Sequence, residues 1–121
     1  MFNIDDRPQF DWPVTICIPA DGGQHVEKRI TGRFRVVPRE EFDSPLLGLD
    51  AATDRAALAK VVVGWGATDI GDAAGQPLPP TPENIRRVLG IDYVRNAFAA
   101  AYGEAITGRP RKNSPRPPAG G

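Results

Sequence analysis

Hydrophobic and polar residues alternate in the first third of the chain, and this alternation predicts a β-hairpin. Val14, Ile16 and Ile18 fall on one side of a first strand. The segment Asp21-Gly22-Gly23 is a turn signal, and the alternation resumes after it. One face of the second strand carries Val26, Lys28, Ile30, Gly32, Phe34 and Val36, and the other carries Glu27, Arg29, Thr31, Arg33 and Arg35. The pattern predicts an antiparallel hairpin with one buried face and one charged face.

Two residues on the apolar face of this hairpin do not fit a uniformly packed strand. Lys28 indicates the open end of the hairpin, where a charged group can reach water. Gly32 indicates a bulge or a close packing contact, because glycine weakens a strand that has no such need of it.

Helical spacing replaces the alternation in the rest of the chain. A short helix is predicted over residues 38–42, because proline followed by two glutamates favours a first helical turn. A longer helix is predicted from about residue 51 to residue 63. Its buried stripe has the spacing i, i+3, i+4, i+7 and consists of Leu58, Val61, Val62 and Trp65. Trp65 is expected to anchor the helices on either side of it.

The last two helices have recognisable ends. Thr81 is a capping residue and Pro82 suits the first helical position, so a helix is predicted to begin there and to end at Gly90 in a left-handed conformation. Asp92 is expected to cap a final helix that reaches about Thr107 and is stopped by Gly108. The predicted fold class is α+β, with an N-terminal antiparallel β-hairpin followed by about four helices in a single domain, residues 1–108.

Charge separates this domain from the end of the chain. The 15 basic and 15 acidic residues cancel, but residues 109–121 contain four basic residues and no acidic one. This Pro-rich basic segment lacks apolar residues and is predicted to be disordered. The remaining domain is mildly acidic, which argues against nucleic acid as a partner. The sequence shows no apolar run for a membrane span and no signal peptide, so we expect a cytoplasmic protein without a membrane partner.

The residue types needed for catalysis are scarce. His25 is the only histidine and Cys17 the only cysteine, which excludes an internal disulfide and fits a reducing compartment. A nucleophilic dyad of these two residues would lack a third orienting group, and they cannot supply a zinc site. A turn histidine and a small buried thiol are the preferred interpretation. The acidic residues between Asp69 and Gly75 do not have calcium-loop spacing. We predict a protein that is not an enzyme and holds no cofactor or metal.

Three groups of residues are candidates for binding a partner. The charged strand face, with Arg29, Arg33 and Arg35, is either a binding surface or a solvated face. The apolar residues Phe42, Leu46 and Leu47 belong either to a shallow client groove or to the ordinary core. The third group, Lys112 and Asn113, lies in the basic tail, for which a solubilising or linker role is the alternative.

A series of segments occurs in a familiar order along the second half of the chain. It comprises Val61-Val62-Val63-Gly64-Trp65, an aspartate–glycine loop from Asp72 to Gly75, Gln76-Pro77-Leu78-Pro79, Thr81-Pro82-Glu83-Asn84, a helix ending Val88-Leu89-Gly90, a helix with Val94, Ala97, Ala101 and Tyr102, and Arg111-Lys112-Asn113. With the hairpin before it, this series resembles the tail assembly chaperones of long-tailed bacteriophages and prophages. The resemblance covers roughly residues 14–113.

The resemblance implies a non-enzymatic assembly factor. Such a protein binds the tape measure protein, keeps it soluble and helps to recruit tail tube subunits, with possible self-association along the client. It acts in the host cytoplasm and is absent from the mature virion. One alternative is a structural tail completion or connector subunit that stays in the virion. Another is a small nucleic-acid-binding regulator that uses the arginine face and the basic tail, against which the acidic domain argues.

Overall fold

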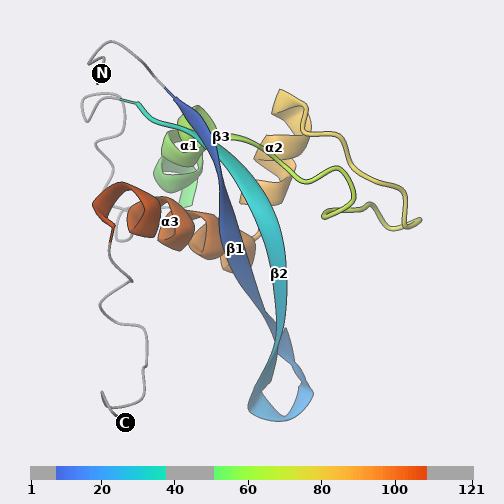
Figure 1. Ribbon diagram of the computed structural model, residues 1–121. Coiled ribbons are helices and arrows are strands. Elements are labelled where there is room, and N and C mark those ends of the chain that lie inside the picture. The colour runs from blue at the N-terminus through green and yellow to red at the C-terminus, as the bar shows by residue number, and fades with distance from the viewer. Residues whose placement is uncertain (1–7, 38–50, 109–121) are drawn as a thin grey trace, which may run out of the picture.

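The computed structural model describes residues 8–37 and 51–108 of the chain. A long hairpin stands beside a group of helices (Figure 1). In chain order the described elements are β1 (Gln9–Ala20), the 3₁₀ turn η1 (Asp21–Gly23), β2 (Gln24–Arg35), α1 (Ala51–Val61), β3 (Val62–Trp65), α2 (Pro82–Leu89) and α3 (Asp92–Thr107). The predicted α+β class with an N-terminal hairpin is therefore confirmed. The described residues contain three α-helices, and the fourth predicted one, residues 38–42, lies outside them, as does the tail, residues 109–121.

The hairpin forms where the alternation predicts it and is longer than the alternation alone indicates. Its two strands pair without interruption from Gln9 opposite Arg35 to Ala20 opposite Gln24. The turn needs its glycines, because Gly22 and Gly23 have φ angles of 80° and 77°. β1 begins well before Val14, and its early residues Phe10 and Trp12 are partly buried against the core.

The main error of the sequence analysis lies at the end of α1. The helix ends at Val61, and Val62–Trp65 form β3, which pairs antiparallel to β2. Three consecutive valines, two of them in β3, favour an extended backbone because their branched side chains are restricted in a helix. All four residues of the predicted helical stripe are nevertheless buried, Leu58, Val61, Val62 and Trp65. The stripe therefore predicted burial correctly and conformation wrongly.

The sheet has the order β1-β2-β3, and its apolar face packs on the helices. Phe34 of β2 is fully buried, and its ring centroid lies 5.9 Å from those of Phe98 and Tyr102 on α3. On the other side, Phe34 stacks on Phe10 of β1 at 5.7 Å. Burial raises the pKa of Tyr102 above its usual value of 10.0, while a hydrogen bond with the backbone of Val37 lowers it. This aromatic cluster joins the hairpin to α3.

Trp65 is the last residue of the sheet's third strand, β3. It lies opposite Gly32 of β2, and its indole Nε1 donates a hydrogen bond of 2.9 Å to the carbonyl of Leu78. This bond fixes the loop between β3 and α2 to the body. The predicted role of Trp65 as a buried anchor fits this position, although it anchors a strand and a loop rather than a helix.

The helix ends confirm two predictions and correct two. The Thr81 hydroxyl accepts a hydrogen bond of 3.2 Å from the N–H of Asn84, and Gly108 closes α3 with a φ of 70°. Gly90 is not left-handed, since its φ is −75°. A Cβ on Gly90 would lie 3.3 Å from the carbonyl oxygen of Arg87, so close backbone packing suits glycine there. Asp92 does not cap α3 with its side chain.

Asp92 instead forms an ion pair within the first turn of α3. Its Oδ1 lies 2.6 Å from NH2 of Arg95, whose side chain is largely buried. NH1 of Arg95 also donates to the carbonyl of Leu89 at 3.2 Å. The buried guanidinium is therefore hydrogen-bonded on both sides, which offsets its loss of water.

None of the helices in the described part of the chain is long and apolar enough to span a membrane.

Candidate functional site: the outer sheet face and the distal arm

The sheet has a second face, on which the helices of the described part of the chain do not pack, and we refer to it as the outer face. Its residues alternate with the core residues along both strands of the hairpin. From β2 it carries Arg29, Arg33 and Arg35, which lie opposite Thr15, Asp11 and Gln9 of β1. These six residues are exposed or half-buried. The three arginines predicted to bind a partner therefore share one solvent-accessible face.

Among the described residues, an acidic neighbour holds one of these arginines, Arg33. NH1 of Arg33 lies 3.0 Å from Oδ1 of Asp11 across the strands. Arg29 and Arg35 have no hydrogen bond or ion pair within residues 8–37 and 51–108. They stand six residues apart, or roughly 20 Å along the strand at about 3.3 Å per residue. Two guanidinium groups are thus left to bind carboxylates of a partner.

The free edge of β1 is less suited to binding than this face. Thr31 directs its backbone groups toward β3: its N–H donates to Asp69 at 2.8 Å, and its carbonyl accepts from Gly66 at 3.0 Å. Its partner Pro13 therefore directs its own backbone outward, as do the alternate residues of β1. Pro13 and Pro19 both lie in this outward set and have no N–H to give. These prolines hinder the addition of a partner strand to β1.

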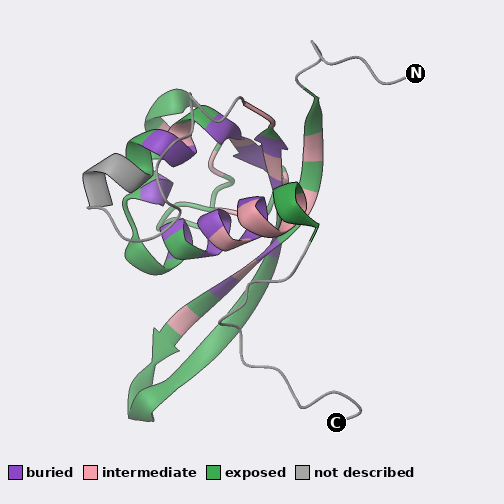
Figure 2. Cartoon of the chain, turned by 90° about the vertical axis from the view of Figure 1, so that its left-hand side faces the viewer, coloured by how far each residue is buried: buried purple, intermediate pink, exposed green. Residues whose placement is uncertain are grey.

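The hairpin projects beyond the helices, and we refer to residues 17–29 as the distal arm. Going toward the turn, Ile16 and Ile30 are the last buried residues of the two strands. Every residue of the distal arm is exposed except Ile18, which is half-buried. Figure 2 shows the buried positions ending where the arm leaves the body. The arm extends about 13 Å, since four residues of β1 at about 3.3 Å each separate Ile16 from the turn.

The predicted site residues divide between the two parts of the hairpin. Arg33 and Arg35 lie at the base of the hairpin, by which we mean residues 9–16 and 30–35. Arg29 lies where the distal arm begins. The other five candidates lie outside the described residues, namely Phe42, Leu46, Leu47, Lys112 and Asn113. The structure thus brings the arginines onto one face, and the apolar and tail residues stay predictions.

Cys17 and Lys28 do not lie where the sequence analysis placed them. Cys17 is exposed rather than buried, because the alternation puts it on the outer face, opposite Glu27. Lys28 lies near the turn rather than at the open end, since it pairs with Ile16. Its charge marks the point at which the apolar face leaves the core.

Within residues 8–37 and 51–108, no group of three or more His, Cys, Asp or Glu residues could hold a metal ion.

The exposure of the arm's apolar side differs from the sequence prediction. Val26 was assigned to the buried face, yet half of its surface is exposed (50%). Lys28 was the available signal, because a lysine between Val26 and Ile30 indicates that burial has ended.

Comparison with family models, with curated proteins and with solved structures finds no match to this chain.

Proposed function

We propose that this protein is a tail assembly chaperone of a long-tailed bacteriophage or prophage. In this function it binds the tape measure protein without catalysis, keeps it soluble and helps to recruit tail tube subunits in the host cytoplasm. The order of segments over residues 14–113 carries the proposal. The outer face supports it, since an exposed sheet face with two arginines that have no ion-pair partner among residues 8–37 and 51–108 is a suitable surface for a protein client.

The spacing of the unpaired arginines constrains the client. Arg29 and Arg35 stand roughly 20 Å apart along the strand. An α-helix rises about 1.5 Å per residue with about 3.6 residues per turn, so carboxylates about 14 residues apart lie on one face of a client helix and would reach both arginines. A long helical tape measure protein offers such positions repeatedly. Phe42, Leu46 and Leu47 stay the predicted apolar contacts.

Co-expression with the tape measure protein of the same phage tests the proposal. The client is expected to stay soluble and to co-purify with this protein, and to precipitate without it. Reversing both charges in the R29E/R35E variant is expected to lower the recovered client roughly tenfold, as for the loss of about 1.4 kcal/mol. The control variant R86E/R87E makes the same charge change on α2, where both side chains are exposed. A client that precipitates equally with and without this protein would contradict the proposal.

A structural tail completion or connector subunit is the second candidate. The distal arm favours it, because a projecting hairpin can reach a neighbouring subunit in a ring or tube. Mass spectrometry of purified particles separates the two functions. A structural subunit is retained in the virion in a fixed ratio to the tube protein, whereas the chaperone is absent.

A further inference from the structure

The distal arm carries an apolar contact pair that the body does not cover. Ile18 and Val26 lie directly opposite each other on the inner face, which is the side that faces the helices at the base. Val26 is 50% exposed, and Ile18 is half-buried. An isolated two-stranded hairpin is only marginally stable in water. An apolar cross-strand pair at the end of such a hairpin gains stability when another surface covers it.

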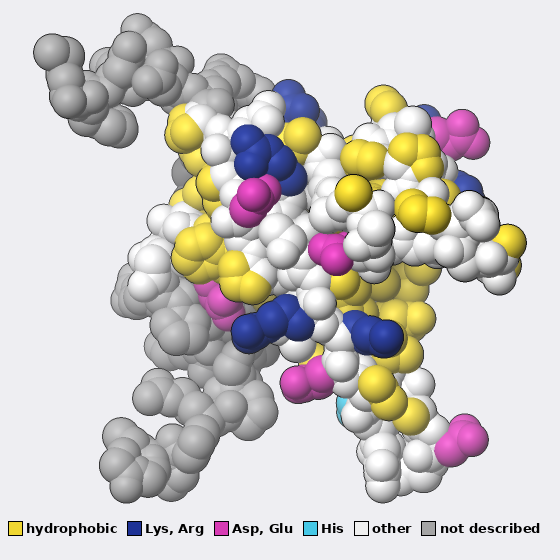
Figure 3. Space-filling view, turned by 45° about the vertical axis from the view of Figure 1, so that its right-hand side comes forward, with side chains coloured by type: hydrophobic (Ala, Val, Ile, Leu, Met, Phe, Trp, Pro, Cys, Tyr) yellow, Lys and Arg dark blue, Asp and Glu magenta, His cyan; other side chains and the backbone are white. Residues whose placement is uncertain are grey.

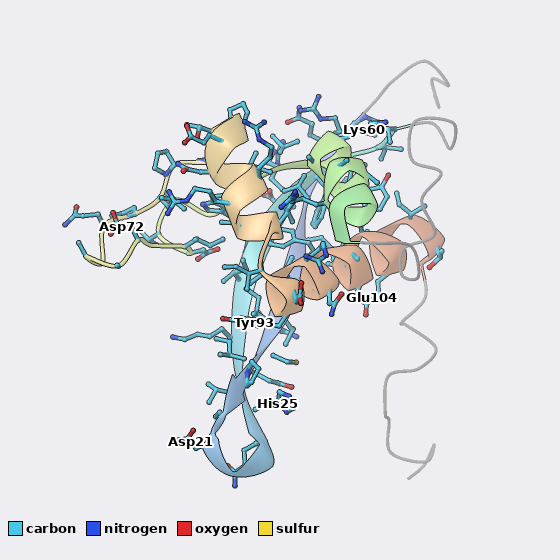
Figure 4. All side chains as sticks on the ribbon, turned by 180° about the vertical axis from the view of Figure 1, so that it is seen from behind. Asp21, His25, Lys60, Asp72, Tyr93 and Glu104 are labelled. Carbon is cyan, nitrogen blue, oxygen red and sulfur yellow. The ribbon has the colours of Figure 1, made fainter. Side chains whose placement is uncertain are left out.

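The start of α3 also carries exposed apolar side chains. Ile91 and Tyr93 are 43% and 37% exposed. Figure 4 shows Tyr93 beside the hairpin, above the labelled arm residues His25 and Asp21. Figure 3 shows hydrophobic side chains running from the body down one side of the arm. Exposed apolar side chains therefore occur both on the arm and at the start of α3.

Charged residues of opposite sign bound the apolar pair. Asp21 lies in the turn at the tip, and Lys28 lies on the inner face, two residues beyond Val26 toward the base. An arm turned end for end places its Lys28 where the first arm has Asp21. Two antiparallel arms therefore match acid with base at both ends and apolar pair with apolar pair in the middle. A client helix flanked by charges of one sign would match only one end.

We propose that two copies of this chain associate through the inner faces of their distal arms. The arms lie antiparallel, so that Ile18 and Val26 of one copy cover those of the other. Asp21 of each copy then lies opposite Lys28 of its partner. The contact is symmetric, as expected of a homodimer. It leaves the outer faces accessible, so the dimer presents two arginine faces and binds a long client by avidity. The association itself needs no client and is independent of the proposed function.

The oligomeric state of the full chain tests the first part of the proposal. Sedimentation equilibrium from about 1 µM to about 1 mM covers dissociation constants in this range. A reducing agent is required, because the exposed Cys17 on the same arm would otherwise cross-link two copies. We expect a reversible monomer–dimer equilibrium. A chain that stays monomeric at the highest concentration would overturn the proposal.

Substitutions on the two faces of the arm locate the interface. Val26→Asp is expected to raise the dissociation constant at least roughly tenfold, because it places a charge in the apolar contact. The matched control His25→Asp introduces the same side chain one residue away, on the outer face, and is expected to leave the dimer intact. Both positions are exposed, so both variants should retain the wild-type circular dichroism spectrum. A dimer that tolerates Val26→Asp does not use this face.

Charge exchange tests the antiparallel alignment. Asp21→Lys and Lys28→Asp are each expected to weaken the dimer severalfold by placing like charges together. The double variant D21K/K28D restores both pairs and is expected to recover most of the wild-type affinity. If the double variant is as weak as the single variants, the antiparallel alignment is wrong.

Discussion

The base and the distal arm of the hairpin are built from the same two strands and follow the same alternation. At the base, the inner face carries Val14, Ile30 and Phe34, all buried. In the distal arm, the same face carries Ile18 and Val26, which remain accessible. The pairing register continues unchanged from the base into the arm, and Ile18 and Val26 are as apolar as the buried residues. The difference shows that alternation determines which side of a strand is apolar, and that packing determines how much of it is buried.

The reason for the difference is the direction in which α3 packs. Figure 1 shows α3 crossing the hairpin rather than running along it. A helix is about 10 Å wide, whereas a 12-residue strand is about 40 Å long. The crossing helix covers only the base, with help from α1. The part of the hairpin that extends past this crossing is left to water or to a partner.

Side-chain truncation should give the largest difference in stability between the base and the distal arm. Phe34→Ala at the base removes a fully buried ring that contacts three other rings, and we expect a loss of about 3–5 kcal/mol in unfolding free energy. Val26→Ala in the arm should cost less than about 1 kcal/mol in the monomer, because half of that side chain is already in water. Urea unfolding at low protein concentration measures both values. Equal losses would contradict the division into a packed base and an uncovered arm.

Adding a methyl group should also destabilise the base more than the distal arm. A Cβ on Gly32 would lie 2.8 Å from Cγ2 of Val14 and 2.9 Å from Cε2 of Phe34. Both neighbours are fully buried and cannot move away freely, so Gly32→Ala should cost about 1–3 kcal/mol. Gln24→Ala in the exposed arm is the control and should change stability by less than about 0.5 kcal/mol. If Gly32→Ala unfolds at the wild-type urea midpoint, the base is not tightly packed.

These same contacts show which parts of the fold the sequence could predict. The turn glycines, the Thr81 cap and the period of each helix are local signals, and they gave the hairpin and the last two helices. The strand Val62–Trp65 was not predictable in this way. Its conformation depends on pairing with β2, which is distant in sequence, and an apolar run of this length fits a buried helix equally well.

The sequence predicts which face of the hairpin carries the candidate site, but not which of its arginines form an ion pair. Alternation placed Arg29, Arg33 and Arg35 on one face, and the structure has them there. That Asp11 neutralises only Arg33 follows from the cross-strand register, which the spacing of β1 alone did not specify. The length of the distal arm depends on where α3 crosses the hairpin, and Lys28 is the one local signal in the hairpin that burial ends there.

The smallest expected effect concerns the ion pair at the base. Asp11 and Arg33 lie 3.0 Å apart, with 61% and 43% of their side chains exposed. Pairs this exposed contribute about 0.2–1 kcal/mol. A double-mutant cycle with Asp11→Ala and Arg33→Ala should give a coupling energy in that range at low salt.

The salt dependence of this coupling extends the comparison to the outer face. Exposed charges are screened, so the coupling between Asp11 and Arg33 should fall toward zero in about 1 M salt. The pair Thr15 and Arg29, which lies opposite across the strands closer to the arm, is the matched control. Threonine carries no charge, so the cycle with Thr15→Ala and Arg29→Ala should show no salt-dependent coupling. A salt-independent coupling for Asp11 and Arg33 would mean that packing rather than charge joins the two side chains.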